Sequence, residues 1–341
     1  MKSRLWQRLL CLCGIALFLS FPRQSAEGIR EGLRLSGAVL IPSLFPVSVL
    51  SCVLAGSASG SGSRLGSAFE SVFRLPRVCL TVYLLGFLGG YPLGAQLTAN
   101  LYADRQLSER EALRFSSFCN HPGPAFLIGT VGVGVFGSAS IGMRLWIVQI
   151  LASLSAALLL SVPGAACAQN RTDFTPAPGS AAVSLPAAIS SCSASMLRLA
   201  GSVCFFRALL RCFETVLPIR TLSPLPLTVL SGLAELSGGV LRLGAFPAES
   251  AFLLAAALSA FGGFCVHLQA LAAFSAARLS AGPYLRGKCL ETALALLYAF
   301  ALRIGSVPSI GICACIALFA LPAFFFLFSA KKHWKSSQSV I

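Results

Sequence analysis

Charged side chains are scarce in this chain of 341 residues: Asp, Glu, Lys and Arg together make up 11% of it, whereas an average soluble domain carries about 25%. A soluble fold that is 56% hydrophobic, with a mean hydropathy of +0.81, lacks the polar residues to cover its surface. A membrane helix needs about 20 apolar residues to cross about 30 Å of hydrocarbon, and several stretches reach that length. The composition therefore predicts an all-α polytopic membrane protein.

Side chains that most enzymes rely on are also rare. The chain has three histidines and eleven acidic residues, and no serine–histidine or paired-carboxylate arrangement is evident. Most of the thirteen cysteines lie inside apolar runs, where a thiol behaves as a small hydrophobe, and no spacing fits a zinc site. No glycine loop followed by Lys and Ser or Thr is found. We expect no enzyme, no catalytic residue, no metal, no cofactor and no ATP-driven pump.

Acidic residues are outnumbered by 26 basic ones, which gives a formal net charge of +15. The basic residues are spread along the ends of apolar segments rather than gathered on one polar domain. This pattern favours cytoplasmic loops in contact with anionic lipid over nucleic-acid binding. We therefore expect a multi-pass protein of the cell membrane whose partner is the lipid bilayer, with no nucleic acid. Homo-oligomerisation is left open.

The order of apolar and polar stretches predicts five regions and nine to eleven membrane segments. Residues 1–28 form an N-terminal transmembrane helix, with a cleaved secretory signal as the alternative. Residues 29–167 form a first repeat, and the polar, proline-rich residues 168–187 a linker. Residues 188–305 form a second repeat. Residues 306–341 form a C-terminal transmembrane helix and a basic, cytoplasmic tail.

The evidence for a repeat lies in matching residues at fixed offsets. Cys119 and Cys265 are 146 positions apart, as are Gly86 and Gly232, and Leu33–Gly37 is answered 164 positions later by Leu197–Gly201. Each copy is expected to contain a glycine-rich re-entrant hairpin, at 78–102 and 224–246, and then a broken helix. The breaks are predicted at Phe118–Pro124 and Phe264–Gln269, and Ser108 with Glu111 predicts a capping box before the first broken helix.

Broken membrane helices at matching places in two halves are the best sequence indication of a transporter's binding site. A break exposes backbone groups that are costly in lipid unless they line a cavity or are held by protein. His121 and His267 are predicted to occupy equivalent places in the two breaks, for substrate contact, proton relay or helix–helix hydrogen bonding. The candidate binding residues are Gly89, Gly90, Tyr91, Pro92, Gly94, Gln96, Asn120, His121, Gly123, Glu235, Ser237, Gly238, His267 and Gln269, with Asn100 as a weaker candidate.

Charged residues in apolar stretches need a separate explanation. Glu235 is interpreted as the one acid in the hydrophobic part of the second hairpin, as a substrate or coupling-ion contact or as the partner of an arginine. Every other acid is expected near a loop or an interface. Arg207, Arg211 and Glu214 fall on one helical face, which favours an interfacial amphipathic helix over a substrate path.

The segments around these residues resemble the YlbJ family of sporulation integral membrane proteins, in the nucleoside-recognition Gate domain group. The resemblance rests on Gly89–Ala95, Asn120–Gly129, Gly232–Gly239 and Gly262–Gln269, and with their surroundings covers about residues 30–305. It implies a plan similar to concentrative nucleoside transporters: two inverted repeats whose hairpin tips and helix breaks face the substrate. It also implies a role in endospore formation, moving dipicolinic acid from the mother cell across the outer forespore membrane.

We therefore expect a secondary transporter for a small organic anion, with dipicolinate the candidate, that works by alternating access. A coupling ion, H⁺ or Na⁺, is left open. The alternatives are a membrane scaffold or partner subunit of a sporulation complex, and a nucleoside-type solute carrier.

Overall fold

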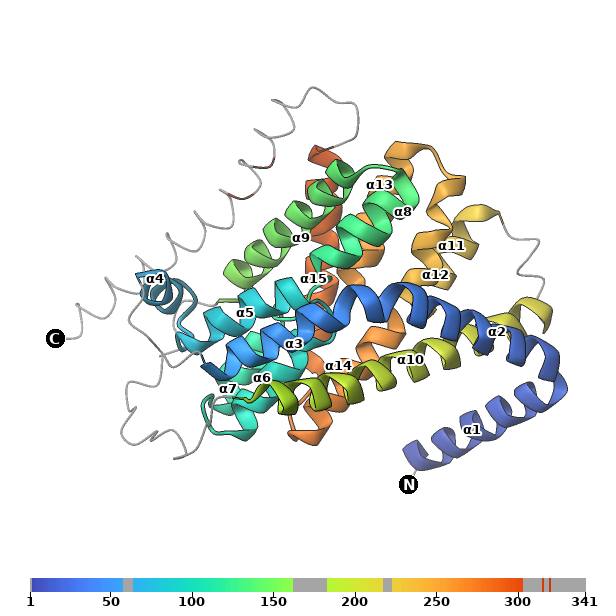
Figure 1. The fold of residues 1–341 in the computed structure, drawn as a ribbon, viewed down its shortest axis with the longest axis horizontal. Coiled ribbons are helices and arrows are strands. Elements are labelled where there is room, and N and C mark those ends of the chain that lie inside the picture. Colours follow the sequence, from blue (N-terminus) through green and yellow to red (C-terminus); the bar gives the residue numbers. More distant parts are fainter. Residues whose placement is uncertain are drawn as a thin grey trace.

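The computed structural model describes residues 2–57, 64–161, 183–216 and 223–302, together with Cys315 and Phe319. Every regular element in these ranges is helical (Figure 1). In order they are α1 (Lys2–Ser20), α2 (Pro22–Leu35), the π-helix η1 (Ser36–Leu40), α3 (Ile41–Ser57), α4 (Arg64–Phe73), α5 (Val78–Gly89), α6 (Leu93–Ala103), α7 (Glu109–Ser116), the π-helix η2 (Ala125–Val133), α8 (Gly134–Phe136), α9 (Ala139–Leu160), α10 (Leu185–Val216), α11 (Pro224–Ala234), α12 (Leu236–Leu241), the 3₁₀-helix η4 (Leu243–Ala245), α13 (Ala248–Phe261), α14 (Gly263–Ala276) and α15 (Gly282–Ala301).

Within the described ranges, three stretches of helix are long and apolar enough to cross a membrane: Pro22–Leu54, Ala139–Leu160 and Ala248–Ala276. A fourth is added if the pair α4 and α5, bent by 97°, forms one broken or re-entrant span. The protein is an integral membrane protein. The described residues thus hold fewer full-length spans than the nine to eleven segments predicted, because several apolar helices, such as α11, are only about half as long as a span.

Close backbone contact joins the first long helix to α10. A Cβ added at Gly28 would lie 2.5 Å from Ala208 Cα, and one at Gly32 would lie 2.6 Å from Cys204 Cα. Residue numbers rise along α2 as they fall along α10, so the two helices run antiparallel, side by side across the molecule (Figure 1). Small residues at such a crossing allow the backbones to approach closely.

The first glycine-rich segment forms a helical hairpin, α5 and α6, joined by a tight turn at residues 90–92. Gly86 and Gly94 face each other across it: a Cβ on Gly86 would lie 3.3 Å from Gly94 Cα and 2.8 Å from the Cys119 carbonyl oxygen. Gly90 has a positive φ of 73°, a conformation that glycine adopts without strain. The hairpin therefore packs against the first helix break through backbone rather than side chains.

The first broken helix begins as predicted. Ser108 caps α7: its hydroxyl accepts from the Glu111 amide while the Glu111 carboxylate accepts from the Ser108 amide. The helix ends at Ser116, residues 120–123 are not helical, and η2 resumes at Ala125. Pro122 and Pro124 lack the amide hydrogens that would continue the helix.

The second break lies earlier than predicted. Helix α13 ends at Phe261, Gly262 and Gly263 have positive φ values of 91° and 74°, and α14 then continues to Ala276. The expected interruption at Phe264–Gln269 is therefore wrong, because two consecutive glycines break the helix before it. His267 lies within α14, whereas His121 lies in the break itself. The two histidines do not occupy equivalent backbone positions.

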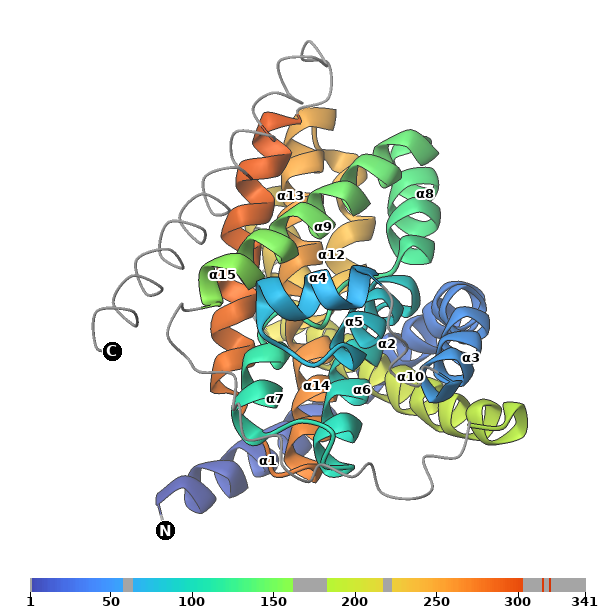
Figure 2. The same cartoon turned by 90° about the vertical axis from the view of Figure 1, so that its left-hand side faces the viewer.

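Helix α15 lies beside α9 and α13 (Figure 2) and also contacts α7. A Cβ at Gly287 on α15 would overlap the Ser117 carbonyl oxygen just after α7. This contact brings α15 against the first break. Of the predicted linker, residues 168–182 lie outside the described ranges, and its last three residues belong to α10, which begins at Leu185; most of the predicted region 306–341 is also outside.

Candidate functional site

The first helix break carries two polar side chains into the protein interior. Asn120 is 1% exposed and His121 is fully buried. The backbone of the break can lie against the hairpin turn because a glycine stands on each side of the contact: a Cβ on Gly123 would lie 3.1 Å from Gly90 Cα. The His121 ring stacks on Phe87 of α5, with 3.9 Å between centroids and 9° between planes. The imidazole is thereby fixed with its two nitrogens pointing toward α15 and α9.

An ion cluster joins this break to α15. His121 Nδ1 lies 2.9 Å from Glu291 Oε1, and Glu291 Oε2 lies 2.8 Å from Lys288 Nζ. The side chain of Glu291 is fully buried and that of Lys288 is 1% exposed. Buried charges are tolerated only when they are paired and hydrogen-bonded. Both oxygens of this carboxylate have such partners.

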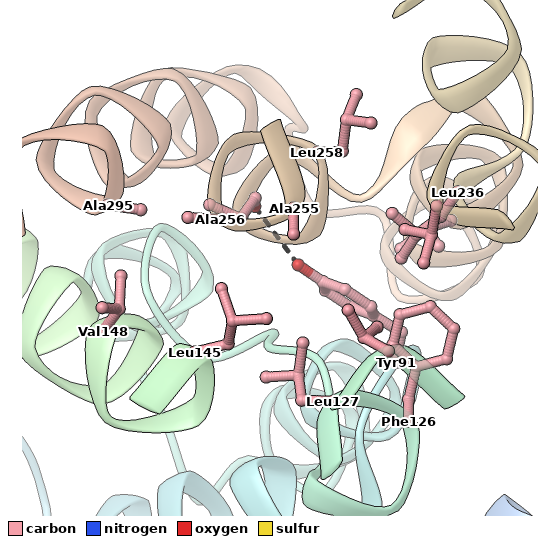
Figure 3. Close-up of a cluster of buried hydrophobic side chains, with 14 of the residues drawn as sticks. Tyr91, Phe126, Leu127, Leu145, Val148, Leu236, Ala255, Ala256, Leu258 and Ala295 are labelled. Carbon is pink, nitrogen blue, oxygen red and sulfur yellow. Dashed lines mark hydrogen bonds between the residues drawn. The ribbon is translucent and has the colours of Figure 1, made fainter. Parts of the chain in front are cut away.

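Lys288 also holds the tip of the first hairpin. Its ammonium donates to the Tyr91 hydroxyl at 3.0 Å and to the Asn120 carbonyl at 3.0 Å, so all three of its N–H bonds have an acceptor. The Tyr91 hydroxyl in turn donates to the Ser259 carbonyl at 2.9 Å, with the Ala260 carbonyl at 3.2 Å. Figure 3 shows the Tyr91 ring among apolar side chains with its hydroxyl directed toward α13. The hairpin turn, the first break and the end of α13 thus meet around one ammonium group.

The histidine of the second half reaches the same region through Tyr284. His267 Nδ1 lies 3.0 Å from the Tyr284 hydroxyl, which also accepts from Asn120 Nδ2 at 3.4 Å. His267 Nε2 and Asn120 Oδ1 are buried without a hydrogen-bond partner among the residues that the structure describes. Tyr284 and Glu291 are seven residues apart, hence on one face of α15. One helix therefore links both predicted histidines, through different partners.

Glu235 belongs to a second polar group, between α10 and α12. Its carboxylate accepts from the Ser237 and Gly238 amides, each at 2.8 Å, and so caps α12. Arg207 Nε lies 3.4 Å from Glu235 Oε2. Of the two roles considered for Glu235, pairing with an arginine is the one seen.

Arg207 does not extend to the membrane–water interface, as its position on the helix had suggested. Its side chain is 14% exposed, and its guanidinium lies 3.3 Å from where a Cβ would stand on Gly238. Arg211 and Glu214 are tied into ion pairs as well: Arg211 contacts both Glu31 and Glu214, and Glu214 also pairs with Arg242 at 2.9 Å. The expectation of an interfacial amphipathic face is wrong, because α10 packs on α2 and these charged side chains are paired with acids and an arginine of other helices.

The remaining candidates fall outside the ion cluster. Gln96 Oε1 accepts from Ser195 on α10 at 3.5 Å, and Gln269 Nε2 contacts its own helix at Cys265 Sγ. Asn100 is exposed. Gly89, Pro92 and Gly94 build the hairpin, and Gly123 supports its turn.

Three residues of α15 that contact the two histidines or Asn120 were missed by the sequence reasoning: Tyr284, Lys288 and Glu291. The expectation that every acid other than Glu235 lies near a loop or an interface is wrong, since Glu291 is fully buried. Lys288 and Glu291 precede an apolar run and look like the polar end of a span. The available signal was a stripe of polar side chains on one face of α15, at Tyr284, Lys288, Glu291 and Tyr298.

Comparison with known proteins gives one partial match. Over 147 residues the chain is 35% identical to the sporulation integral membrane protein YlbJ of Bacillus subtilis (strain 168). The alignment covers 42% of this chain and 36% of the relative, so it spans about a third of that protein's length. No family model and no solved structure matches. The similarity is partial and at the level of a family.

Proposed function

We propose that this protein is a secondary carrier for a small organic anion, with dipicolinate in endospore formation as the candidate. The observation that carries the proposal is the ion cluster of His121, Lys288 and Glu291, buried where the first hairpin, both broken helices and α15 meet. A charged side chain at the bilayer centre costs about 2.5–3.5 kcal/mol on insertion scales. Such groups are expected where they contact a solute or an ion rather than where they only pack.

The contact of α2 with α10 supports inverted repeats. Ser36 and Ala200 are equivalent residues at the 164-residue offset. In the antiparallel contact, Gly28 lies against Ala208 and Gly32 against Cys204. Continuing that register places Ser36 opposite Ala200, its own counterpart. This is the arrangement expected beside a two-fold axis between antiparallel equivalent helices, and such repeats are common in transporters.

The polar contacts suggest how access to the site would alternate. Tyr91 connects the first hairpin to the end of α13 and, through Lys288, to α15. Glu235 and Arg207 secure the second glycine-rich segment, α11 and α12, to α10. In our proposal each group closes one side of the site and opens when the other forms. The candidate residues on the two hairpins, among them Gly90, would line the path.

The role in sporulation is taken from the name of the similar Bacillus subtilis protein and is part of the proposal, as is placement in the outer forespore membrane. A nucleoside-type carrier would use the same architecture with a neutral solute. A membrane scaffold would need the helices but not the buried ions. The proposal is that the protein is a carrier and not an enzyme.

The test is uptake of labelled dipicolinate by proteoliposomes containing the purified protein. Lys288→Met should reduce uptake at least tenfold, because the ammonium connects Tyr91, Asn120 and Glu291. Arg286→Gln is the matched control: the residue lies on the same helix and is exposed, and its variant should retain uptake. Labelled uridine in parallel distinguishes the nucleoside carrier. Wild-type liposomes that take up neither solute would contradict the carrier.

A second measurement addresses the biological role. Spores of a strain lacking the protein should accumulate less dipicolinate, and the wild-type gene should restore it. Restoration by Lys288→Met at normal protein levels would favour a scaffold instead.

A further inference from the structure

The hydroxyl of Ser153 on α9 lies within hydrogen-bonding distance of three groups, and it cannot bond to all three when His121 is neutral. Its Oγ lies 2.9 Å from the Tyr83 hydroxyl, 3.2 Å from His121 Nε2 and 3.2 Å from the Phe118 carbonyl oxygen. Ser153 is fully buried. A serine hydroxyl has one proton to donate and two lone pairs to accept with. Ser153 can therefore donate to His121 or to the Phe118 carbonyl, but not to both.

The charge of His121 decides between these two arrangements. Nδ1 faces the Glu291 carboxylate, an acceptor, so it carries a hydrogen in either case. In neutral His121, Nε2 is an acceptor and receives the Ser153 hydroxyl proton. In the imidazolium, Nε2–H donates to Ser153 Oγ, and the hydroxyl turns to donate to the Phe118 carbonyl. Tyr83 can donate to Ser153 Oγ in both. Adding one proton from water thus requires only that one hydroxyl rotates.

We propose that His121 is the site of a coupling proton, which changes the net charge of the His121–Lys288–Glu291 cluster from zero to +1 as the anionic solute binds. The inference rests on the proposed carrier function. An isolated extra charge is costly in a buried site, so an anion nearby favours protonation. By linkage, protonation strengthens anion binding by the same factor.

The surroundings favour a proton over Na⁺ as the coupling ion. The ammonium of Lys288 lies 2.8 Å from Glu291 Oε2 and would repel a metal cation at that carboxylate. Besides Glu291 and Lys288 of α15, the polar side chains of the described residues near His121 include Tyr83 of α5, Ser153 of α9 and, through Lys288, Tyr91 of the hairpin turn. None of these adds a negative charge that would hold Na⁺.

Protonation would also change the hydrogen bonding of the break itself. Phe118 lies just after α7, and its carbonyl is among those left without a continuing helix. It accepts from Ser153 only in the imidazolium arrangement. Proton binding would thus alter the backbone bonding at the first break, the place where the halves of the broken helix would move relative to each other.

The first test needs no solute. The protein in lipid nanodiscs is titrated from pH 8 to pH 4 and followed by infrared difference spectroscopy, with His121→Gln subtracted to isolate this imidazole. We expect an imidazolium signal accompanied by a change in the tyrosine C–O band, and both should be absent from His121→Gln.

Two variants test the relay. Ser153→Ala should move the midpoint down by about 0.5–1 pH unit, because a hydrogen bond from a charged donor is about twice as strong as a neutral one. Tyr83→Phe is the matched control, since that hydroxyl can donate to Ser153 in both arrangements, and its midpoint should move less. A titration that is identical in wild type and His121→Gln, or unmoved in Ser153→Ala, would overturn the proposal.

The second test measures coupling. In proteoliposomes with an alkaline lumen and a trapped pH dye, wild-type protein should accumulate labelled dipicolinate and acidify the lumen by at least one proton per molecule. In His121→Gln, whatever its basal rate, the pH gradient should no longer accelerate uptake. Uptake by wild type without proton movement overturns this inference while the carrier function stands. If wild type moves no dipicolinate, the carrier function fails, and the infrared titration still decides the proton site.

Discussion

The buried pair of Lys288 and Glu291 allows a quantitative prediction about stability. Two unit charges 2.8 Å apart attract by about 6 kcal/mol at an effective dielectric constant of about 20. Both side chains are also removed from water, which offsets most of that attraction in the intact pair. Removing one partner loses the attraction but leaves the other charge buried. Glu291→Gln should therefore lower the free energy of unfolding by about 3–5 kcal/mol.

The double variant Lys288→Met/Glu291→Gln gives the contrasting result. With both charges gone, no uncompensated ion remains, so the loss should be at least about 2 kcal/mol smaller than the sum of the two single losses. Some cost persists, because Tyr91 and the Asn120 carbonyl lose a donor. Transport should not return with stability, since the ammonium is absent.

The assay is equilibrium unfolding of the purified protein in mixed micelles with increasing SDS, followed by circular dichroism. The four proteins form a double-mutant cycle, which isolates the coupling between the two side chains. Arg286→Gln, exposed on the same helix, should leave the unfolding midpoint unchanged. Additive single losses, or a Glu291→Gln variant as stable as wild type, would refute the reasoning that this ion pair is buried and mutually dependent.

Three further predictions concern packing, capping and the hairpin turn. Gly94→Ala should prevent accumulation of folded protein, because its Cβ would overlap a backbone carbonyl of the first break. Gly129→Ala, with open space around it, should fold normally. The two variants are compared by detergent-solubilised yield and by size-exclusion profile. Glu235→Ala should speed hydrogen exchange of the α12 amides that now donate to its carboxylate. The control is Glu249→Ala, exposed in the first turn of α13, which should change the protection of the α13 amides by the equivalent of only about 0.3–1 kcal/mol. Equal protection of α12 in wild type and Glu235→Ala would contradict the cap. Tyr91→Phe should lower the free energy of unfolding by about 1–3 kcal/mol by leaving a buried ammonium hydrogen without its acceptor, and an unchanged SDS midpoint would argue against that bond.

The class of protein and some of its local structure could be predicted from the sequence alone. Low charge and long apolar runs identified a helical membrane protein, since lipid excludes polar surface whatever the tertiary arrangement. The capping box at Ser108 and Glu111 and the break at Asn120–Gly123 were predictable, because capping and proline act through neighbouring residues. The predicted second break was wrong by a few residues, because the helix is interrupted by the positive φ of Gly262 and Gly263, just before the motif that contains His267.

The partners of the buried groups were decided by tertiary structure. Lys288 and Glu291 are three residues apart, and nothing in that spacing distinguishes a solvated pair from a buried one. They are buried because Gly287 lets α15 approach the backbone after α7, which places His121, 170 residues away, against Glu291. Arg207 and Glu235 are likewise paired only because the fold brings α10 within side-chain reach of the N-terminus of α12. Composition and local pattern show whether a segment needs an apolar environment or a partner for a polar group. Which distant segment provides that partner depends on where the helix backbones can approach each other.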